Sequence, residues 1–320
     1  MISRNWLPWL DSAKRREVHE KITIVAEEEL KKRHWGARAG GKLTYGIPRF
    51  LVTDIRGAAL VSGMIRYHLA GSGSRLFYRG QTSDYPILPG VFRDTKNKKE
   101  RQEAIDWLQA VLADLPKYFD PQDPFRDDLL REGLAQHYGL PTAWIDVVDH
   151  FQTAAWFAYE KKGIDSGRDL DNEALDDSVG YVYLLAAQDE QDAGYCRWRD
   201  LRIKPSNWLR PHIQQAFVLR LTQPIACKGL LSGLVVSALI VPRTLLRQWS
   251  NHDSMPYSVM YPNAVLDRGL FYWNQASKAL IRKHGHDMRP ASDPLHNALG
   301  ANRAIRVQEA VGGSRPHNLK

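Results

Sequence analysis

Three short runs rich in apolar and β-branched residues, in the second half of the chain, most constrain its fold. They are "YVYLLAA" (Tyr181–Ala187), "QAFVLRLT" (Gln215–Thr222) and "LVVSALIVP" (Leu234–Pro242). Runs of this length and composition are typical of strands. Helical patterns and long loops separate the predicted strands without regular β-α alternation. The sequence therefore predicts an α+β fold with a mixed central sheet and flanking helices.

Helical patterns precede and follow these strands. Asp11–Arg33 has strong helix formers and charges throughout, which predicts an exposed amphipathic helix. A second helix over Asp54–Gly71 begins at a capping aspartate and ends in a Gly-Ser-Gly-Ser joint. We expect a helical extension over 1–71, a main domain over 72–283 and a disordered tail over 284–320. Further helices are predicted over Asn97–Phe119, Pro124–Gly139, Arg243–His252 and Asn263–Arg282.

Composition indicates a globular chain with a mild preference for acidic partners. Of its 320 residues, 43% are hydrophobic and 25% charged, which is enough apolar material for one large domain or two modest ones. Lys and Arg number 44 against 36 Asp and Glu, giving a net charge of +8. Such an excess favours phosphates, nucleotides or nucleic acid as ligands.

Cysteine usage and hydropathy predict a cytoplasmic location. Cys196 and Cys227 form no CxxC pair, so neither a disulfide framework nor a zinc ribbon is expected, and a reducing compartment is favoured. The first residues, "MISRNWLPWLDSAKRR", lack the pattern of a signal peptide. The longest apolar run, Leu230–Val241, is too short to span a bilayer, so no membrane association is expected.

A conspicuous polar motif lies in "LFYRGQTSDYPILPGVFR", Leu76–Arg93. An arginine at the end of a strand and beside a glycine is well placed for an anion, because the glycine permits close approach and the guanidinium offers a planar pair of donors. Arg79 would therefore bind an anionic ligand, with Gln81 as a neutral donor and acceptor. The alternative is that Arg79 forms a structural ion pair with an acid such as Asp146.

A second polar cluster lies in "LAQHYGLPTAWIDVVDHFQTAAWFAYE", Leu134–Glu160. Gln136, His137 and Tyr138 stand at a predicted helix end, and "AWIDVV" predicts a strand that carries Asp146. His137 could orient a ligand, act as a general base, or be a satisfied structural residue. The small residues of "FQTAAWFAYE" are typical of a helix that packs closely on its neighbour.

The two motifs in this order resemble the FRG domain, which is named for its (F/Y)-R-G motif. "FYRGQ", "ILPGVFR", "QHYGLPT", an aspartate and an "A-x-x-FA"-like helix carry the resemblance over Leu76–Glu160. Weaker similarity continues in "WLRPHIQQAFVLRL" and "MYPNAVLDRGL". Where family members generally have Thr-Arg-Leu-Leu-Asp-Trp-Thr, this chain keeps the first threonine and the aspartate but lacks the arginine, the tryptophan and the second threonine.

A further, weaker similarity is to ADP-ribosyltransferases, in which an arginine or histidine of a first strand binds NAD and a late glutamate orients the ribose. The late position would fall on Gln214 or Gln215, and neither carries the charge of a glutamate. The resemblances imply a nucleotide or NAD pocket, with His137, Asp146 and Gln215 as catalytic candidates. The residues that would bind the cofactor are Tyr78, Arg79, Gly80, Gln81, Arg93, Gln136 and Tyr138.

Two functional classes remain open on the sequence. One is an enzyme of the ADP-ribosyltransferase or NAD glycohydrolase type, with NAD as cofactor and no metal. The other is a non-catalytic module that binds nucleic acid or a protein. In "RWRDLRIKPSNWLRP", Arg197–Pro211, arginines alternate with Trp198 and Trp208, which suits phosphate contacts and base stacking or, equally, a solvated basic face. The short "HGHD" at His284–Asp287 is too closely spaced to predict a metal site.

Overall fold

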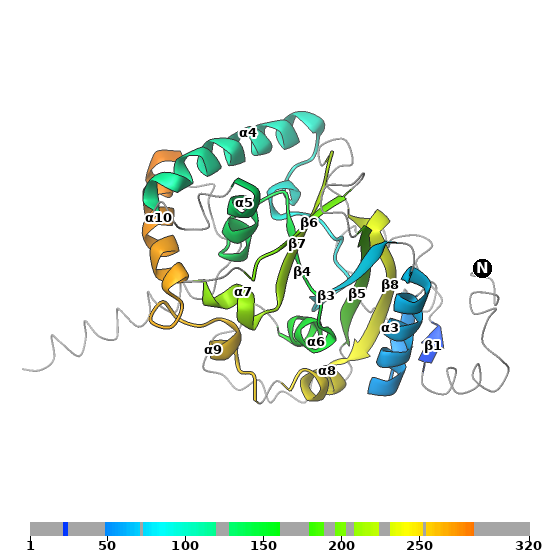
Figure 1. The fold of residues 1–320 in the computed structure, drawn as a ribbon. Helices are drawn as coiled ribbons and strands as arrows, with labels where there is room; N and C mark the ends of the chain where they lie inside the picture. The colour runs from blue at the N-terminus through cyan, green and yellow to red at the C-terminus, as the bar shows by residue number, and fades with distance from the viewer. Residues whose placement is uncertain are drawn as a thin grey trace, which may run out of the picture.

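A computed structural model describes residues 22–24, 49–70, 73–119, 128–160, 179–188, 196–202, 208–223, 231–251 and 254–284. These residues form one eight-stranded sheet with helices packed against it (Figure 1). The strands are β1 (Ile22–Ile24), β2 (Arg49–Val52), β3 (Ser74–Gln81), β4 (Ile145–Val148), β5 (Val179–Gln188), β6 (Cys196–Asp200), β7 (Ala216–Leu221) and β8 (Val235–Pro242).

The sheet is mixed, and its strand order places β3 near the middle. The order is β1-β2-β8-β5-β3-β4-β7-β6. β2 and β8 are parallel, whereas every other neighbouring pair is antiparallel. The α+β class and the mixed central sheet predicted from the sequence are confirmed.

The helices follow the capping signals of the sequence. They are α3 (Ile55–Leu69), α4 (Lys98–Asp114), α5 (Asp128–His137), α6 (Phe151–Tyr159), α7 (Leu209–Ile213), α8 (Arg243–Trp249), α9 (Tyr257–Met260) and α10 (Arg268–His284). The Asp54 carboxylate accepts a hydrogen bond from the Arg56 amide at 2.7 Å, and the Asn97 side chain accepts one from the Glu100 amide at 2.9 Å. Both residues therefore act as the N-caps that helices require.

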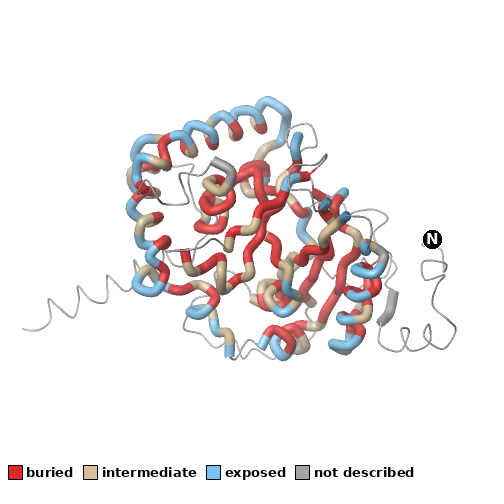
Figure 2. The backbone as a smooth tube through the Cα atoms, in the orientation of Figure 1, coloured by how far each residue is buried: buried red, intermediate tan, exposed pale blue. Residues whose placement is uncertain are grey.

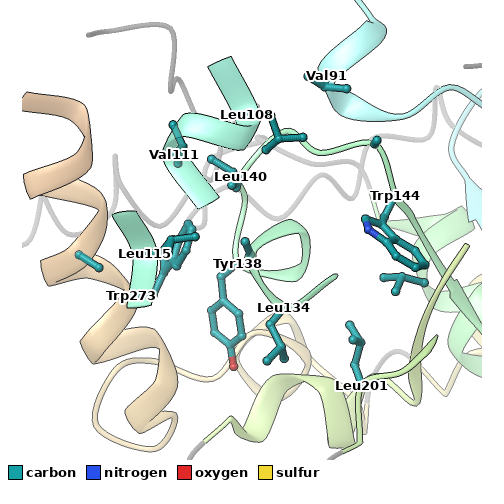
Figure 3. Close-up of a cluster of buried hydrophobic side chains, with 14 of the residues drawn as sticks. Val91, Leu108, Val111, Leu115, Leu134, Tyr138, Leu140, Trp144, Leu201 and Trp273 are labelled. Carbon is teal, nitrogen blue, oxygen red and sulfur yellow. The ribbon is translucent and has the colours of Figure 1, made fainter. Parts of the chain in front are cut away.

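Three hydrophobic clusters hold the sheet and the helices together. The α4 cluster joins α4, α5 and α10 to β7, and Figure 3 shows Leu108, Leu134 and Tyr138 within it. The α6 cluster packs α3, α6 and α8 on β2, β3, β5 and β8. The strand cluster is built mostly from strand residues. In Figure 2 the buried residues run through the sheet, while α4 and α10 expose their outer sides.

Side-chain alternation on β3 divides these clusters between the two faces of the sheet. Leu76 and Tyr78 belong to the α6 cluster, and Phe77 belongs to the strand cluster. This division follows from the geometry of a strand, in which successive side chains point to opposite faces of the sheet.

The N-terminal prediction needs one correction. Ile22–Ile24, inside the helix predicted over 11–33, form strand β1, which pairs with β2. A β-branched Ile-Thr-Ile segment suits a strand better than a helix, and pairing with β2 supplies its backbone partners. The rest of that predicted helix, and residues 285–320 of the predicted tail, lie outside the described residues.

The predicted domain boundary falls between two elements that share one core. Helix α3 lies before residue 72 and β3 after it, and both contribute to the α6 cluster. Strand β2 is hydrogen-bonded to β8 in the same sheet. The start of the main domain at residue 72 stays a prediction. Among the helices that the structure describes, none has the length and apolar character needed to cross a membrane.

The tryptophans of the basic and aromatic stretch Arg197–Pro211 are not placed for the base stacking that the sequence suggests. Trp198 is 7% exposed and Trp208 is fully buried, because both rings pack into the hydrophobic clusters. Arg199 and Arg210 are buried as well. Neither tryptophan offers a face for a nucleic-acid base, so the stacking half of this interpretation is wrong.

Candidate functional site

The sheet opens between β3 and β4. Strand β3 pairs with β5 from Ser74 to Gln81, but it pairs with β4 only through Tyr78 and Val148. Strand β4 pairs with β7 along its whole length. The two central strands therefore separate beyond this single pair, and backbone groups that a continuous ladder would use become available to side chains.

Arg79 bridges this opening. Its Nη1 donates a hydrogen bond to the main-chain carbonyl of Asp146 at 2.6 Å. With the Gln81 amide oriented so that its nitrogen donates to the Tyr85 carbonyl, the Gln81 oxygen accepts from Arg79 Nε at 3.2 Å. The predicted contact between Arg79 and Asp146 exists, but it goes to the backbone and not to the carboxylate.

The side chain of Arg79 is partly buried. Burial is the main reason that its pKa falls to about 10, and the nearby charge of Arg93 acts in the same direction. The charge of Asp146 and the hydroxyls of Tyr183 and Tyr261 oppose that fall. Among the described residues no carboxylate lies within ion-pair distance of Arg79, and the Asp146 carboxylate acts on it only as a nearby charge.

The end of α5 places two more of the predicted residues, Gln136 and His137, at the opening between β3 and β4. Gly139 has φ of 103°, a left-handed conformation that favours glycine. Its amide donates to the Gln136 carbonyl at 3.0 Å and the Leu140 amide donates to the Ala135 carbonyl at 2.9 Å. This is a Schellman ending, which fixes the last turn of the helix and with it Gln136 and His137.

Gln136 and His137 both contact the carboxylate of Asp146. Gln136 Nε2 donates to Asp146 Oδ2 at 3.1 Å, and His137 Nδ1 lies 3.4 Å from Asp146 Oδ1. Gln136 Oε1 accepts from the hydroxyl of Thr142 at 2.9 Å, which sets the orientation of the amide. The structure therefore brings Arg79, Gln136, His137 and Asp146 together.

The carboxyl of Asp146 is strongly acidic. Burial alone would raise its pKa, but the hydrogen bond and charge of His137, followed by the charge of Arg79 and the Gln136 amide, lower it to about 2. The Asp146 side chain is 39% exposed. A carboxylate that is ionised at neutral pH and open to solvent thus lies next to the Arg79 guanidinium.

His137 is held with one ring nitrogen turned inward. Its side chain is 4% exposed. The Nε2 atom is buried and has no hydrogen-bond partner. A buried polar atom of this kind is rare in proteins and calls for a reason in ligand binding or chemistry. If Nδ1 donates to Asp146, the neutral imidazole presents a lone pair at Nε2.

Tyr138, predicted to bind a cofactor, is a core residue. It is 1% exposed, and its hydroxyl donates to Asp267 Oδ2 at 2.7 Å (Figure 3 labels this tyrosine). Burial, together with the charge of Asp267, raises the pKa of Tyr138 well above its ordinary value. Asp267 also accepts from the backbone amides of Leu209, Arg210 and Leu270. This carboxylate therefore joins the end of α5 to the starts of α7 and α10.

Two further residues of the β3 motif have packing roles. Tyr78 is 2% exposed within the α6 cluster, with its ring edge against Phe151 at 6.0 Å. A side chain at Gly80 would place Cβ 1.9 Å from the Ala154 carbonyl oxygen of α6. Close approach of a helix, rather than of a ligand, is the reason the structure gives for this glycine. Arg93 is exposed, near enough to Arg79 to affect its pKa.

The two late glutamines do not reach the carboxylate. Gln215 has φ of 51°, and its amide accepts from Arg202 at 3.0 Å and donates to the His212 carbonyl at 3.3 Å. Gln214 is 3% exposed and donates to the Met260 carbonyl at 2.6 Å. Both amides are therefore occupied by hydrogen bonds within the protein.

Two charged residues of the site region are not apparent from the sequence. Asp267 precedes α10, where an acid signals a helix cap, and no local pattern indicates its wider role. Arg210 lies in the basic stretch that the sequence attributes to surface contacts. In the described part of the chain, no cluster of three or more His, Cys, Asp or Glu side chains could hold a metal ion.

Comparison with known families agrees with the motif at the sheet opening. The FRG domain family matches residues 74–166, from the start of β3 to just beyond α6. The protein contains an FRG domain. Arg79, Gln136, His137 and Asp146 all lie within this FRG domain, whereas Arg210 and Asp267 follow it in the chain. No curated protein and no solved structure matches the chain.

Proposed function

We propose that the FRG domain of this protein binds a nucleotide, with NAD as the leading candidate, through Arg79 at the opening between β3 and β4. The observation that carries the proposal is the burial of the Arg79 side chain and the set of its hydrogen-bond partners. The side chain is partly buried, it is held by the Asp146 carbonyl and the Gln81 amide, and it has no ion-paired carboxylate among the described residues. A phosphate would supply a negative charge in direct contact with the guanidinium and accept from its remaining nitrogen, Nη2.

Chemistry of the ADP-ribosyltransferase or NAD glycohydrolase type is the catalytic form of this proposal. Such a reaction develops positive charge on the ribose as nicotinamide leaves, and a fixed carboxylate nearby would stabilise that charge. Asp146 is ionised and partly exposed, while Gln214 and Gln215 are uncharged and engaged elsewhere. We therefore assign the charged role to Asp146 in place of the glutamines. His137 and Gln136 would hold its carboxylate in position.

Calorimetric titration with NAD tests the proposal. Arg79→Lys keeps the charge but loses the planar fork, so the lysine cannot serve both the Asp146 carbonyl and a phosphate. Loss of a charge-assisted hydrogen bond costs about 1.5 to 3 kcal/mol, and we expect affinity to fall by roughly 10- to 150-fold. Nicotinamide release by the wild type and by Asp146→Asn then separates catalysis from binding.

Arg220→Lys is the matched control. Arg220 pairs with Glu132 at 2.7 Å, contacts neither Arg79 nor Asp146, and a lysine can keep that ion pair. Its NAD affinity should equal that of the wild type. If the wild type does not bind NAD and Arg79→Lys lowers the melting temperature by several degrees, Arg79 is a scaffold residue. Salt-sensitive binding of RNA or DNA by such a protein would then favour the alternative, a nucleic-acid binding module.

A further inference from the structure

Arg210 is a buried cation whose hydrogen-bonding capacity the protein leaves unused. It lies in α7 and is 2% exposed. Its Nη1 donates to the His137 carbonyl at 3.3 Å, but Nε and Nη2 are buried without any hydrogen-bond partner. The guanidinium lies between two aromatic rings, 4.8 Å from the centre of Tyr138 and 5.1 Å from that of Tyr261.

No carboxylate of the described residues forms an ion pair with this guanidinium. Asp267 is the nearest acid in the network, but it accepts from the backbone amide of Arg210 and from the hydroxyl of Tyr138, not from the guanidinium. The two ring contacts offset part of the lost hydration. They leave two nitrogens, Nε and Nη2, without hydrogen-bond partners, and an unpaired buried charge is strongly unfavourable unless a ligand completes it.

A continuous chain of contacts connects Arg210 to Arg79. Arg79 donates to the carbonyl of Asp146, the Asp146 carboxylate contacts His137 Nδ1 at 3.4 Å, and the His137 carbonyl accepts from Arg210. The ring of Tyr261 also contacts Arg210. The two arginines are therefore connected through the pair of His137 and Asp146.

We propose that Arg210 is a second anion-binding residue and that the ligand carries two linked phosphates. This inference rests on the proposed function, in which Arg79 binds the first phosphate. A diphosphate, as in a nucleoside diphosphate or a dinucleotide, would place its second phosphate against Nε and Nη2 of Arg210. That pair of nitrogens forms the planar fork that suits phosphate oxygens.

The half-buried ring of Tyr261 covers Arg210 and must turn aside for the ligand to enter. Tyr261 follows α9, a single short helical turn, and stacks on Tyr257 at 4.6 Å. It also contacts the rings of Trp156 and Phe157 in α6. Turning the ring aside gives up these aromatic contacts, whereas the hydrogen bonds of Asp146 are made by Arg79, Gln136 and His137 and do not involve Tyr261.

Titration with AMP and with ADP, which differ by one phosphate, tests the proposal. We expect the wild type to bind ADP more tightly than AMP. Arg210→Met, of similar length but without charge, should lose roughly tenfold or more of its ADP affinity and keep its AMP affinity. Its melting temperature should stay equal or rise, because replacing an unpaired buried charge by an apolar side chain is often stabilising.

Arg220→Met is the matched control. It removes an arginine that has a carboxylate partner, Glu132, and it should lower the melting temperature while leaving both affinities unchanged. Should Arg210→Met fail to fold, Arg210→Lys keeps the charge, loses the fork, and should still bind ADP less tightly than the wild type does.

The outcomes separate this inference from the proposed function. If AMP binding depends on Arg79 but ADP binds no more tightly, or if Arg210→Met binds ADP like the wild type, the second phosphate site is overturned and the first stands. If ADP affinity depends on Arg210 but not on Arg79, the assignment of Arg79 fails. If neither nucleotide binds, both proposals are overturned.

Discussion

Replacement of Gly80 by alanine tests whether this glycine of the FRG motif serves packing or ligand access. A Cβ atom at this position would lie 1.9 Å from the Ala154 carbonyl oxygen, 2.6 Å from the Ala158 amide nitrogen and 2.9 Å from the Ala154 carbonyl carbon. All three are backbone atoms of α6. A rotamer change cannot relieve the overlap, so either the helix or the strand must move.

The expected destabilisation is large. Inserting one methyl group into a packed core typically costs about 1 to 3 kcal/mol, and contacts with backbone atoms place this substitution near or above the upper limit. Helix α6 lies against β3 through Ala154 and Ala158, two small residues of the α6 cluster that permit this close approach. At roughly 2 to 4 °C per kcal/mol, a loss of about 3 kcal/mol lowers the melting temperature by about 6 to 12 °C.

Thermal unfolding followed by circular dichroism measures this effect, and Gly63→Ala is the matched control. Gly63 lies inside α3 and is exposed, and a Cβ atom added there would meet no atom within 4 Å. Alanine there should stabilise the protein by roughly 0.5 to 1 kcal/mol, because alanine favours the helix. A Gly80→Ala variant with unchanged melting temperature and weakened nucleotide binding would contradict the packing argument and restore the role in ligand access.

Two further substitutions test the polar contacts of the site. Tyr138→Phe removes the donor to the buried Asp267 carboxylate, so we expect a loss of about 1.5 to 3 kcal/mol, measured by urea denaturation, with nucleotide affinity unchanged. Asp146→Asn tests the lowered pKa of this carboxyl, about 2 in the folded protein against an ordinary value of 3.8. Its stabilising contribution is fully present above about pH 4 and is lost as the pH falls through 2. Stability of the wild type should therefore decline more steeply than that of Asp146→Asn between pH 4 and 2, and parallel curves would contradict the assignment.

Local signals predict much of the fold. Asp54 and Asn97 cap α3 and α4, and Gly139 ends α5, as their positions in the sequence indicate. Strand β6 is not predicted, because "CRWRD" alternates only over five residues and carries three charges. Its pairing with β7 supports it instead. The strand order could not be predicted, because it depends on contacts between segments far apart in the chain.

The residues of the candidate site likewise fall into those that local sequence signals predict and those that they do not. Arg79, His137 and Asp146 follow recognisable local signals, a strand end or a helix end, and the structure brings them together. Only its position in the sequence suggests Gln215 as a member of the site. Its backbone has a positive φ, and its side-chain amide accepts a hydrogen bond from Arg202 and does not contact Asp146. Nor does sequence distinguish a buried arginine from a surface one, which is why Arg210 becomes apparent only from its burial between two tyrosine rings.

The opening between β3 and β4 explains why an arginine suits the FRG motif at this position. Beyond the single pair of Tyr78 and Val148, the carbonyl of Asp146 lacks the β3 partner that a regular ladder would give it. Arg79 Nη1 takes that place, so the guanidinium is fixed across the opening by a backbone acceptor. Nη1 of Arg79 bonds the Asp146 carbonyl, and Nε bonds the Gln81 amide oxygen. The third guanidinium nitrogen, Nη2, therefore stays available for an anion. A lysine has a single nitrogen and cannot keep these roles on separate, fixed atoms.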